Sequence, residues 1–260
     1  MNIKLTQIAA LARLSLLDLY RRKDLVVVFI LCAVLITPLA FFAPFGIPGA
    51  SRQMSELSLL LIWIFSLIIS TAVATRLIPP ELESRTIYPL LAKPVSRGTI
   101  LFGKYCGALA ASLSALLLFY IAFALLSGLR EHLWFPPVLL QAFILHAAAV
   151  ILLCALTLLG SLVLTPSANW TVAALLTVSM LAFGGKIPQY AASQPAPTRQ
   201  ILALLDLLAP HFDFFDMRMR VVHQWPEISW GLCGFILLYA LVYSFLCLGL
   251  ASVLFKRKRI

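Results

Sequence analysis

Charged and hydroxyl-bearing side chains are concentrated in one polar stretch, residues 79–104, which lies between two long apolar segments. It reads Pro-Pro-Glu-Leu-Glu-Ser-Arg-Thr, then Leu-Leu, Lys-Pro-Val-Ser-Arg and Gly-Lys. This mixture offers ion pairs, hydrogen bonds and a small apolar surface, but no acid, base and metal-ligand group of the kind that an active site needs. The stretch therefore indicates docking onto a soluble partner.

The middle of this stretch, within residues 79–98, is expected to form a short amphipathic helix. Pro79-Pro80 stops the preceding helix, because a proline forces the residue before it out of the helical region. Glu81 and Glu83 then fall in the first turn of a new helix, where negative charge complements the helix N-terminus. The apolar stripe at spacings i, i+3 and i+4 consists of Ile87, Leu90 and Leu91.

The end of the amphipathic helix is also marked in the sequence. Pro94 ends it, and Ser96 is expected to cap the next long helix, because a serine hydroxyl accepts a hydrogen bond from a free amide of the first turn. From these patterns alone, a plain interfacial linker between two spans remains as good an interpretation as a docking helix.

A second set of polar residues lies inside the apolar segments, where hydroxyls and one histidine are found but no Asp or Glu. The possible lining of a translocation path consists of Ser66, Ser70, Thr71, Thr75, His146 and Thr157. An ionisable residue at membrane depth is a functional candidate. Two alternatives stay open: small polar residues also let helices pack closely, and a neutral histidine can simply bond to a neighbouring helix.

Other chemistries are disfavoured by the sequence. It contains no Gly-x-x-x-x-Gly-Lys-[Ser/Thr] phosphate loop, so ATP hydrolysis is expected in another polypeptide. The acids and histidines of residues 211–223 match no tight metal-ligand spacing, and the five cysteines lie in apolar segments at irregular intervals. We expect no catalytic site, no metal and no cofactor.

The elements that must position these residues are membrane-spanning helices. The chain is 62% hydrophobic with a mean hydropathy of +1.00, and about 20 apolar residues cross a bilayer core. The expected spans are Leu25–Phe45, Leu57–Ile78, Thr99–Ser127, Val138–Leu164, Asn169–Phe183 and Ser229–Phe255, of which Asn169–Phe183 is marginal in length. The fold class is therefore an all-α polytopic membrane protein with six transmembrane helices, in one domain over residues 1–260.

The distribution of basic residues sets the expected orientation. Of the 20 Lys and Arg residues, 14 lie before the first span, in or next to the connection between the second and third spans, or after the last span. Because basic loops stay on the cytoplasmic side, both termini and residues 79–98 are expected there. The net charge of +10 is explained by this asymmetry, so we expect no nucleic-acid partner. The basic tail Lys256–Arg259 is expected to act as a stop-transfer anchor, with contact to anionic lipid headgroups as the alternative.

Two further elements are expected outside the spans. Residues 1–24 contain Leu and Ile at helical spacing on one face and charged residues on the other, which predicts an interfacial helix, with a plain cytoplasmic extension of the first span as the alternative. Residues 185–228 form the longest external connection, in which Gln200–Leu208 is apolar enough for a short helix but too short to span a membrane. This helix is therefore expected to lie in the membrane interface or to dip partway into the membrane.

The stretch from Glu81 to Lys104 resembles the cytoplasmic signature of ABC-2 type transporter permeases. In that signature an acidic turn and a threonine precede Leu-Leu, a Pro-Val-Ser-Arg turn and Gly-Lys at the start of the third span. The resemblance implies a coupling helix between spans 2 and 3 that is seated in a groove of an ATPase subunit. The residues implied in this coupling are Glu81, Glu83, Arg85, Thr86, Leu90, Leu91, Pro94, Arg97 and Lys104. Arg85 stands where the usual pattern has glycine.

The resemblance implies a permease subunit that couples ATP hydrolysis by a separate ATPase to export across a bacterial inner membrane. It implies a homodimer or heterodimer of permeases. Two other hypotheses remain: a membrane anchor or channel subunit that does not transport by itself, and, less well supported, a membrane-embedded enzyme.

Overall fold

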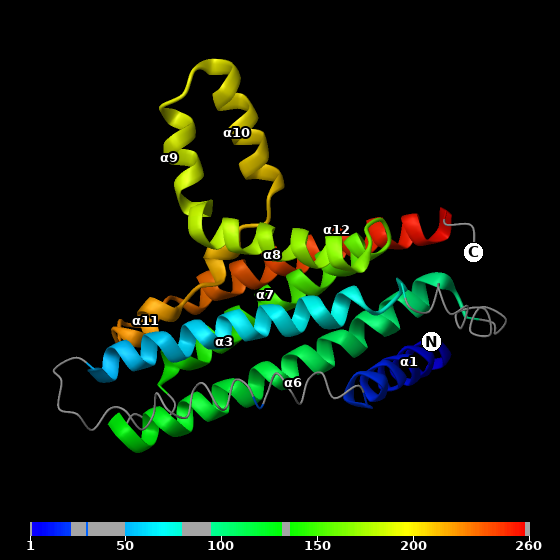
Figure 1. Cartoon of the computed structure of the whole chain (residues 1–260), viewed down its shortest axis with the longest axis horizontal. Helices are drawn as coiled ribbons and strands as arrows, with labels where there is room; N and C mark the ends of the chain where they lie inside the picture. The colour runs from blue at the N-terminus through cyan, green and yellow to red at the C-terminus, as the bar shows by residue number, and fades with distance from the viewer. Residues whose placement is uncertain (1, 22–29, 31–49, 80–94, 132–135, 258–260) are drawn as a thin grey trace.

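The computed structural model describes residues 2–21, 30, 50–79, 95–131 and 136–257, and in these residues it contains helices and turns but no strand. The expected all-helical fold is confirmed. Four long helices run side by side: α3 (Ala50–Thr75), α6 (Arg97–Glu131), α7 (Pro137–Ser161) and α12 (Trp230–Arg257). Figure 1 shows them as one elongated bundle with α8 (Pro166–Phe183) laid against it.

Five stretches of the described residues are long and apolar enough to cross a membrane. They are Arg52–Thr75, Arg97–Leu129, Pro137–Ser161, Pro166–Ala192 and Trp230–Arg257. They correspond to the second to sixth expected spans. The expected first span, Leu25–Phe45, and most of the coupling segment lie outside the described residues, so the number of six spans stays a prediction.

Helix α7 is the centre of the bundle and packs against α3, α6, α8 and α12. Most of its side chains are buried, including the alanines of its middle turns, such as Ala148 and Ala149. Small residues of this kind let neighbouring helices approach closely in a membrane protein. By contrast, α8 and α12 expose large apolar side chains on their outer faces, for example Leu175, Phe235 and Phe245.

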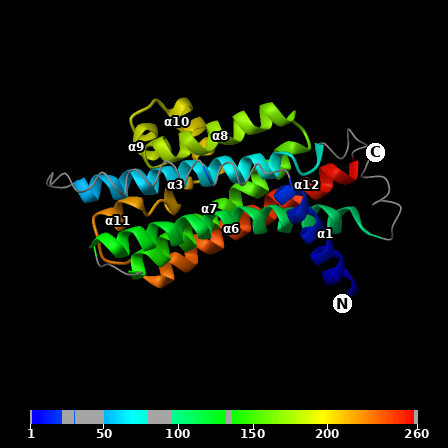
Figure 2. The same cartoon turned by 60° about the horizontal axis from the view of Figure 1, so that its bottom comes forward.

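Helix α1 (Asn2–Arg21) confirms that the N-terminal residues are helical. It lies at an angle to the bundle and packs on the N-terminal part of α6 (Figure 2). Leu11 is the buried residue of this contact, whereas Leu14 and Leu17 are exposed. Its expected position at a membrane surface stays a prediction.

The connection between α8 and α12 contains more structure than the sequence predicts. It consists of η2 (Gly184–Lys186), α9 (Ile187–Ala192), α10 (Ala196–Leu208), η3 (Phe212–Phe215) and α11 (Arg218–Val222). Helices α9 and α10 form a hairpin that stands away from the bundle, while η3 and α11 pack onto α3, α7 and α8 (Figure 1). The predicted short helix is the last part of α10.

Helix α8 is joined to α7 by an asparagine that fits over a glycine. Asn169 Nδ2 donates hydrogen bonds to Thr157 O at 2.9 Å and to Thr75 Oγ1 at 3.4 Å. A Cβ atom at Gly160 would lie 2.1 Å from Asn169 Oδ1. Only glycine therefore allows this side chain to lie between α3, α7 and α8.

The substitution Gly160→Ala is expected to lower the free energy of unfolding by about 1–3 kcal/mol, because the added methyl group overpacks the junction at Asn169. The measurement is thermal unfolding of the detergent-solubilised protein. Gly249→Ala in α12 is the matched control, since no atom lies within 4 Å of a Cβ there. Equal melting temperatures for the two variants would contradict this account of the junction.

Candidate functional site

Two of the nine residues implied in coupling, Arg97 and Lys104, lie within the described part of the chain. The other seven, Glu81, Glu83, Arg85, Thr86, Leu90, Leu91 and Pro94, lie outside it. The described part nevertheless includes both flanks of the coupling segment, up to Pro79 and from Val95 onward. We call the residues that meet at these flanks the base cluster: Leu11, Leu77, Ser96, Arg97, Gly103, Lys104 and Phe255.

Ser96 caps helix α6, as the sequence predicts. The backbone amide of Thr99 donates a hydrogen bond to Ser96 Oγ at 3.1 Å, and the two hydroxyls lie 2.7 Å apart. The cap satisfies an amide of the first turn that has no partner inside the helix. The cap thereby fixes the start of α6 at Arg97, directly after residues 79–96.

Arg97 ties the start of α6 to the end of α12. Its Nη1 donates hydrogen bonds to the carbonyl oxygens of Phe255 at 3.1 Å and Lys256 at 3.3 Å. These carbonyls belong to the last turn of α12, where a cation is favourable for the helix dipole. A Cβ at Gly98 would lie 3.6 Å from Ser252 Oγ, an ordinary contact distance, so α6 and α12 are close neighbours here.

Lys104 joins α6 to the end of α3 by a similar hydrogen bond to a backbone carbonyl. Its side chain is only 3% exposed, and Nζ donates a hydrogen bond to Leu77 O at 3.0 Å, in the turn that follows α3. A buried ammonium group requires such acceptors. The lysine therefore holds the last residues before the coupling segment against α6.

Gly103, the residue before this lysine, has a separate role. A Cβ at this position would lie 2.7 Å from Leu11 Cβ and 3.4 Å from Ile8 O, so α1 packs directly on the backbone of α6 here. The two residues of the Gly-Lys pair thus contact different elements: Gly103 packs against α1, and Lys104 binds the turn after α3. Together the base cluster joins α1, α3, α6 and α12 at one end of the bundle.

The possible path residues are all buried inside this chain, each with 0–3% of its surface exposed. Ser70 donates to Ser66 O, and Thr71 Oγ1 donates to Leu67 O at 2.7 Å. Thr157 Oγ1 donates to Leu153 O at 2.8 Å. Hydroxyls that bond to their own helix in this way are satisfied without water or a substrate.

The structure brings Ser66 and His146 together with two aromatic residues, and we call Trp63, Ser66, Tyr120 and His146 the His146 cluster. His146 Nε2 lies 2.6 Å from Ser66 Oγ, and His146 Nδ1 lies 3.2 Å from Tyr120 Oη. Ser66 Oγ also donates to Trp63 O at 2.9 Å. Every group is satisfied when Nε2–H donates to Ser66 and the Tyr120 hydroxyl donates to Nδ1, which describes a neutral imidazole.

An ion pair from outside the spans covers the His146 cluster. The Trp63 ring stacks on the imidazole with centroids 4.1 Å apart, and Arg218 Cζ lies 5.7 Å from the centroid of the Trp63 ring. Arg218 in turn donates two hydrogen bonds to Asp216, at 2.9 and 2.7 Å. The start of α11 therefore lies against α3, and α11 also packs against α7.

Sequence reasoning singled out Ser66 and His146 but missed Tyr120, Asn169 and Arg218. Tyr120 and Asn169 lie in apolar segments, where one polar residue gives no spacing pattern. Arg218 lies in the external connection, and nothing in the sequence relates it to Trp63. These partners are separated from one another by whole helices, so only the packing brings them together.

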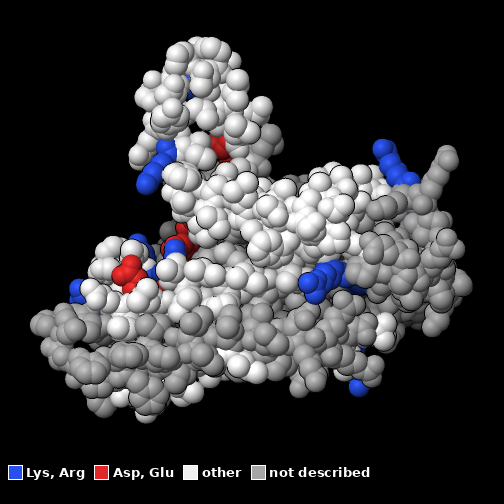
Figure 3. Space-filling view, in the orientation of Figure 1, with Lys and Arg blue, Asp and Glu red and all other residues white. Residues whose placement is uncertain are grey.

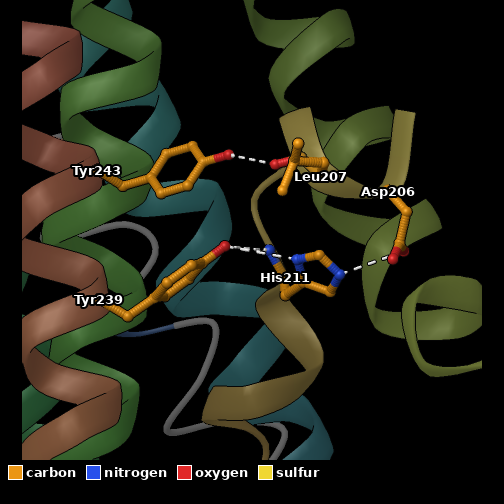
Figure 4. Close-up of polar contacts among 5 residues, drawn as sticks. All are labelled: Asp206, Leu207, His211, Tyr239 and Tyr243. Carbon is orange, nitrogen blue, oxygen red and sulfur yellow. Dashed lines mark hydrogen bonds and ion pairs between the residues drawn. The ribbon is translucent and has the colours of Figure 1, made fainter. Parts of the chain in front are cut away.

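Residues 206–216 place acids and histidines near one another without forming a metal-ligand group: among the described residues, no three His, Cys, Asp or Glu side chains converge. His211 pairs with Asp206, at 3.2 Å from Nε2 to Oδ1 (Figure 4). Asp213 packs against Gly184 and Gly185, and burial raises the pKa of its carboxyl group. The carboxylates of Asp206 and Asp213 therefore contact other residues of the same external connection.

A comparison with models of protein families matches residues 55–260 to the model described as ABC-2 family transporter protein. The match covers well over half of the chain and includes α3 from Ser55 onward and every later described helix. No curated protein matches the chain.

The hydrogen bonds of Arg97 to Phe255 O and of Lys104 to Leu77 O predict separate, local effects on amide hydrogen exchange. Arg97→Met should speed exchange in the last turn of α12 by about two- to fivefold, because a cation at a helix C-terminus contributes about 0.3–1 kcal/mol. Lys104→Met should speed exchange at residues 76–79 and leave the end of α12 unchanged. Each variant is the control for the other, and the same exchange pattern in both would contradict separate ties.

Proposed function

This chain belongs to the ABC-2 family of transporter proteins, and we propose that it is the permease of an exporter driven by ATP hydrolysis in a separate subunit. The family consists of membrane transporter subunits that are not themselves catalytic and that generally partner with an ATP-binding subunit. The multi-pass helical structure agrees with that assignment. The direction of transport and the coupling to ATP are what the proposal adds.

The observation that carries the coupling proposal is the base cluster. Residues 79–98 connect α3 to α6, and both flanks are tied by cations to helix ends, Lys104 to Leu77 and Arg97 to Phe255. A push on the segment by an ATPase would therefore act on α3, α6 and α12 together. This would convert closure of an ATPase pair into tilting of the spans.

Transport further requires a second permease chain and a membrane. The outer faces of α8 and α12 expose apolar side chains that suit lipid or another permease, for example Val172, Leu175 and Phe235. In Figure 3 the surface over α8 carries no charged residue, whereas Lys and Arg side chains lie toward the ends of the bundle and on the hairpin. We propose a dimer of permeases in a bacterial inner membrane, with both termini cytoplasmic.

An anchor subunit without transport activity is the competing hypothesis, and the substitution Leu90→Asp separates the two. A charge in the apolar stripe of the coupling helix should abolish stimulation of the ATPase by the permease while the complex still assembles. The measurement is ATP hydrolysis by the reconstituted complex, with co-purification as the test of assembly.

Leu90→Ile is the matched control and should retain stimulation, because it keeps an apolar side chain of the same volume. Unchanged stimulation in Leu90→Asp, with the complex intact, would rule out coupling through this segment.

The proposed path through Ser66, Ser70, Thr71, Thr75, His146 and Thr157 requires that water reach these residues during turnover. In a cysteine-free background, Ser70→Cys should react with a water-soluble thiol reagent only while ATP is hydrolysed. Leu152→Cys, equally buried on α7 but outside the path set, should stay unreactive. Protection of Ser70→Cys throughout turnover would contradict a path along this face of α3.

A further inference from the structure

A cavity of about 140 Å³ lies among α3, α6, α7 and the residues around α11, at the helix ends that the proposed orientation places outside. We call it the outer cavity. Its described walls include Ser55, Phe123, Ser127, Leu139, Val222 and Trp225, and most of the lining is apolar. An apolar cavity of about 150 Å³ takes up a benzene molecule. The outer cavity therefore has the size and the lining for one aromatic ring or a short alkyl group.

The outer cavity lies at the level of the membrane boundary. Ser55, Ser127 and Leu139 are each within five residues of the end of their helix, so they lie within about 8 Å of it. Arg52 and Glu56, which flank Ser55 on α3, are exposed, and charged side chains avoid hydrocarbon. The ends of lipid acyl chains lie about 15 Å deeper, at the middle of the bilayer. An occupant therefore enters from the external water or from the headgroup region.

The turn that ends α11 fixes the wall formed by Trp225. The amide of Trp225 donates to Arg220 O at 3.0 Å and that of Gln224 to Val221 O at 3.3 Å, which is the bond pair of a Schellman motif. The guanidinium carbon of Arg220 lies 6.0 Å from the centroid of the Trp225 ring, and its Nη1 donates to Pro226 O at 3.1 Å. The indole, which is 49% exposed, is thus held in place at the side of the cavity.

Gln224 occupies the position of this turn where glycine is usual. Its φ is 53°, and it is the one non-glycine residue with positive φ among those that the structure describes. A side chain destabilises the left-handed conformation, and strain of this kind is typical of binding sites. The exposed amide of Gln224 lines the cavity and can both donate and accept hydrogen bonds. The residue therefore indicates a hydrogen-bonding group at the mouth of a mainly apolar cavity, as in many ligand sites.

The outer cavity adjoins the His146 cluster. On α6, Phe123 of the cavity is three residues from Tyr120 of the cluster, and on α7, Leu139 is seven residues from His146. Residues at these spacings share one face of a helix and are separated by one or two turns. The cavity is therefore at the outer end of the proposed path, of which His146 and Ser66 are members.

We propose that the outer cavity binds the apolar group of a small, uncharged amphipathic molecule, whose polar part hydrogen-bonds to Gln224. The apolar group has about the size of one aromatic ring. The segments that form the mouth carry charges of both signs, Arg52 and Arg220 against Glu56 and Glu227, so they favour neither an anion nor a cation. The inference rests on the orientation and the path in the proposed function but not on ATP coupling. It assigns a ligand class to the external end of that path.

Val222→Cys, in a cysteine-free chain, places a thiol in the cavity wall and tests the polarity of the cavity. The protein in phospholipid nanodiscs is treated with benzyl methanethiosulfonate, which has one apolar ring, or with 2-sulfonatoethyl methanethiosulfonate, which is charged. Val222→Cys should react at least about tenfold faster with the benzyl reagent, because an apolar cavity disfavours a charge. His223→Cys is exposed and is the control, at which the two rates should agree within about threefold.

Filling the cavity provides a second comparison. Ser127→Leu, added to Val222→Cys, should slow the benzyl reaction at least about fivefold, because the larger side chain occupies the space. Ser114→Leu on the same helix is the matched control and should leave the rate unchanged. Ser114 is exposed, and both serine hydroxyls donate to a carbonyl three residues earlier in α6.

Protection by benzyl alcohol tests the role of Gln224. This uncharged ligand should protect Val222→Cys from the benzyl reagent. Gln224→Gly keeps the turn but removes the amide, so it should raise the half-protecting concentration about fivefold, as expected for one hydrogen bond. An unchanged concentration would overturn the contact with Gln224.

Three results would overturn the site itself. Equally slow reaction of Val222→Cys with both reagents would mean that protein closes the cavity. A benzyl rate that Ser127→Leu leaves unchanged would mean that the reagent does not use the cavity. Reaction in lipid-free detergent but not in nanodiscs would mean that lipid fills it. Ser55→Cys, on the opposite wall, repeats the test if Val222→Cys does not fold. None of these rates depends on ATP hydrolysis, so loss of coupling and absence of the site give different results.

Discussion

Polar groups inside this bundle have to find partners within the chain, because the surroundings of its outer faces are hydrocarbon and supply none. That constraint explains three kinds of polar contact in the bundle. Serines and threonines return their hydroxyls to their own helix, His146 uses both ring nitrogens on Ser66 and Tyr120, and Arg97 and Lys104 satisfy carbonyls at helix ends. Each contact satisfies a polar group within the chain, and those of His146, Arg97 and Lys104 also join neighbouring helices.

Two regions of the molecule meet this constraint differently. At the base cluster, cations bind carbonyls where a helix ends, so α3, α6 and α12 are joined beside residues 79–98. The root of the α9–α10 hairpin, residues 206–211, instead bonds to α12 part-way along that helix, through the hydroxyls of Tyr239 and Tyr243 (Figure 4).

The sequence predicted the helices well where hydropathy alone determines them, as in α3, α6, α7 and α12. It also predicted the cap at Ser96, because capping depends on residues three positions apart. It predicted one short helix in residues 185–228, where the structure has α9, α10, η3 and α11. Phe212 and Phe215 are fully buried there, but the helices that bury them are distant in sequence, and no local pattern reveals their contacts.

Local sequence therefore determined the class of protein, the positions of the described long helices and the polar signature between α3 and α6, since apolar length, proline and capping act within a few residues. The tertiary structure decided what the signature residues and the histidine do. Gly103 and Lys104 are adjacent in sequence, yet one receives Leu11 and the other binds Leu77 O. Arg218, in the external connection, lies over the ring of Trp63 in α3, which is 155 residues earlier in the sequence (218 minus 63). These assignments depend on which helices pack together, and that is set by the sum of many side-chain contacts along the bundle.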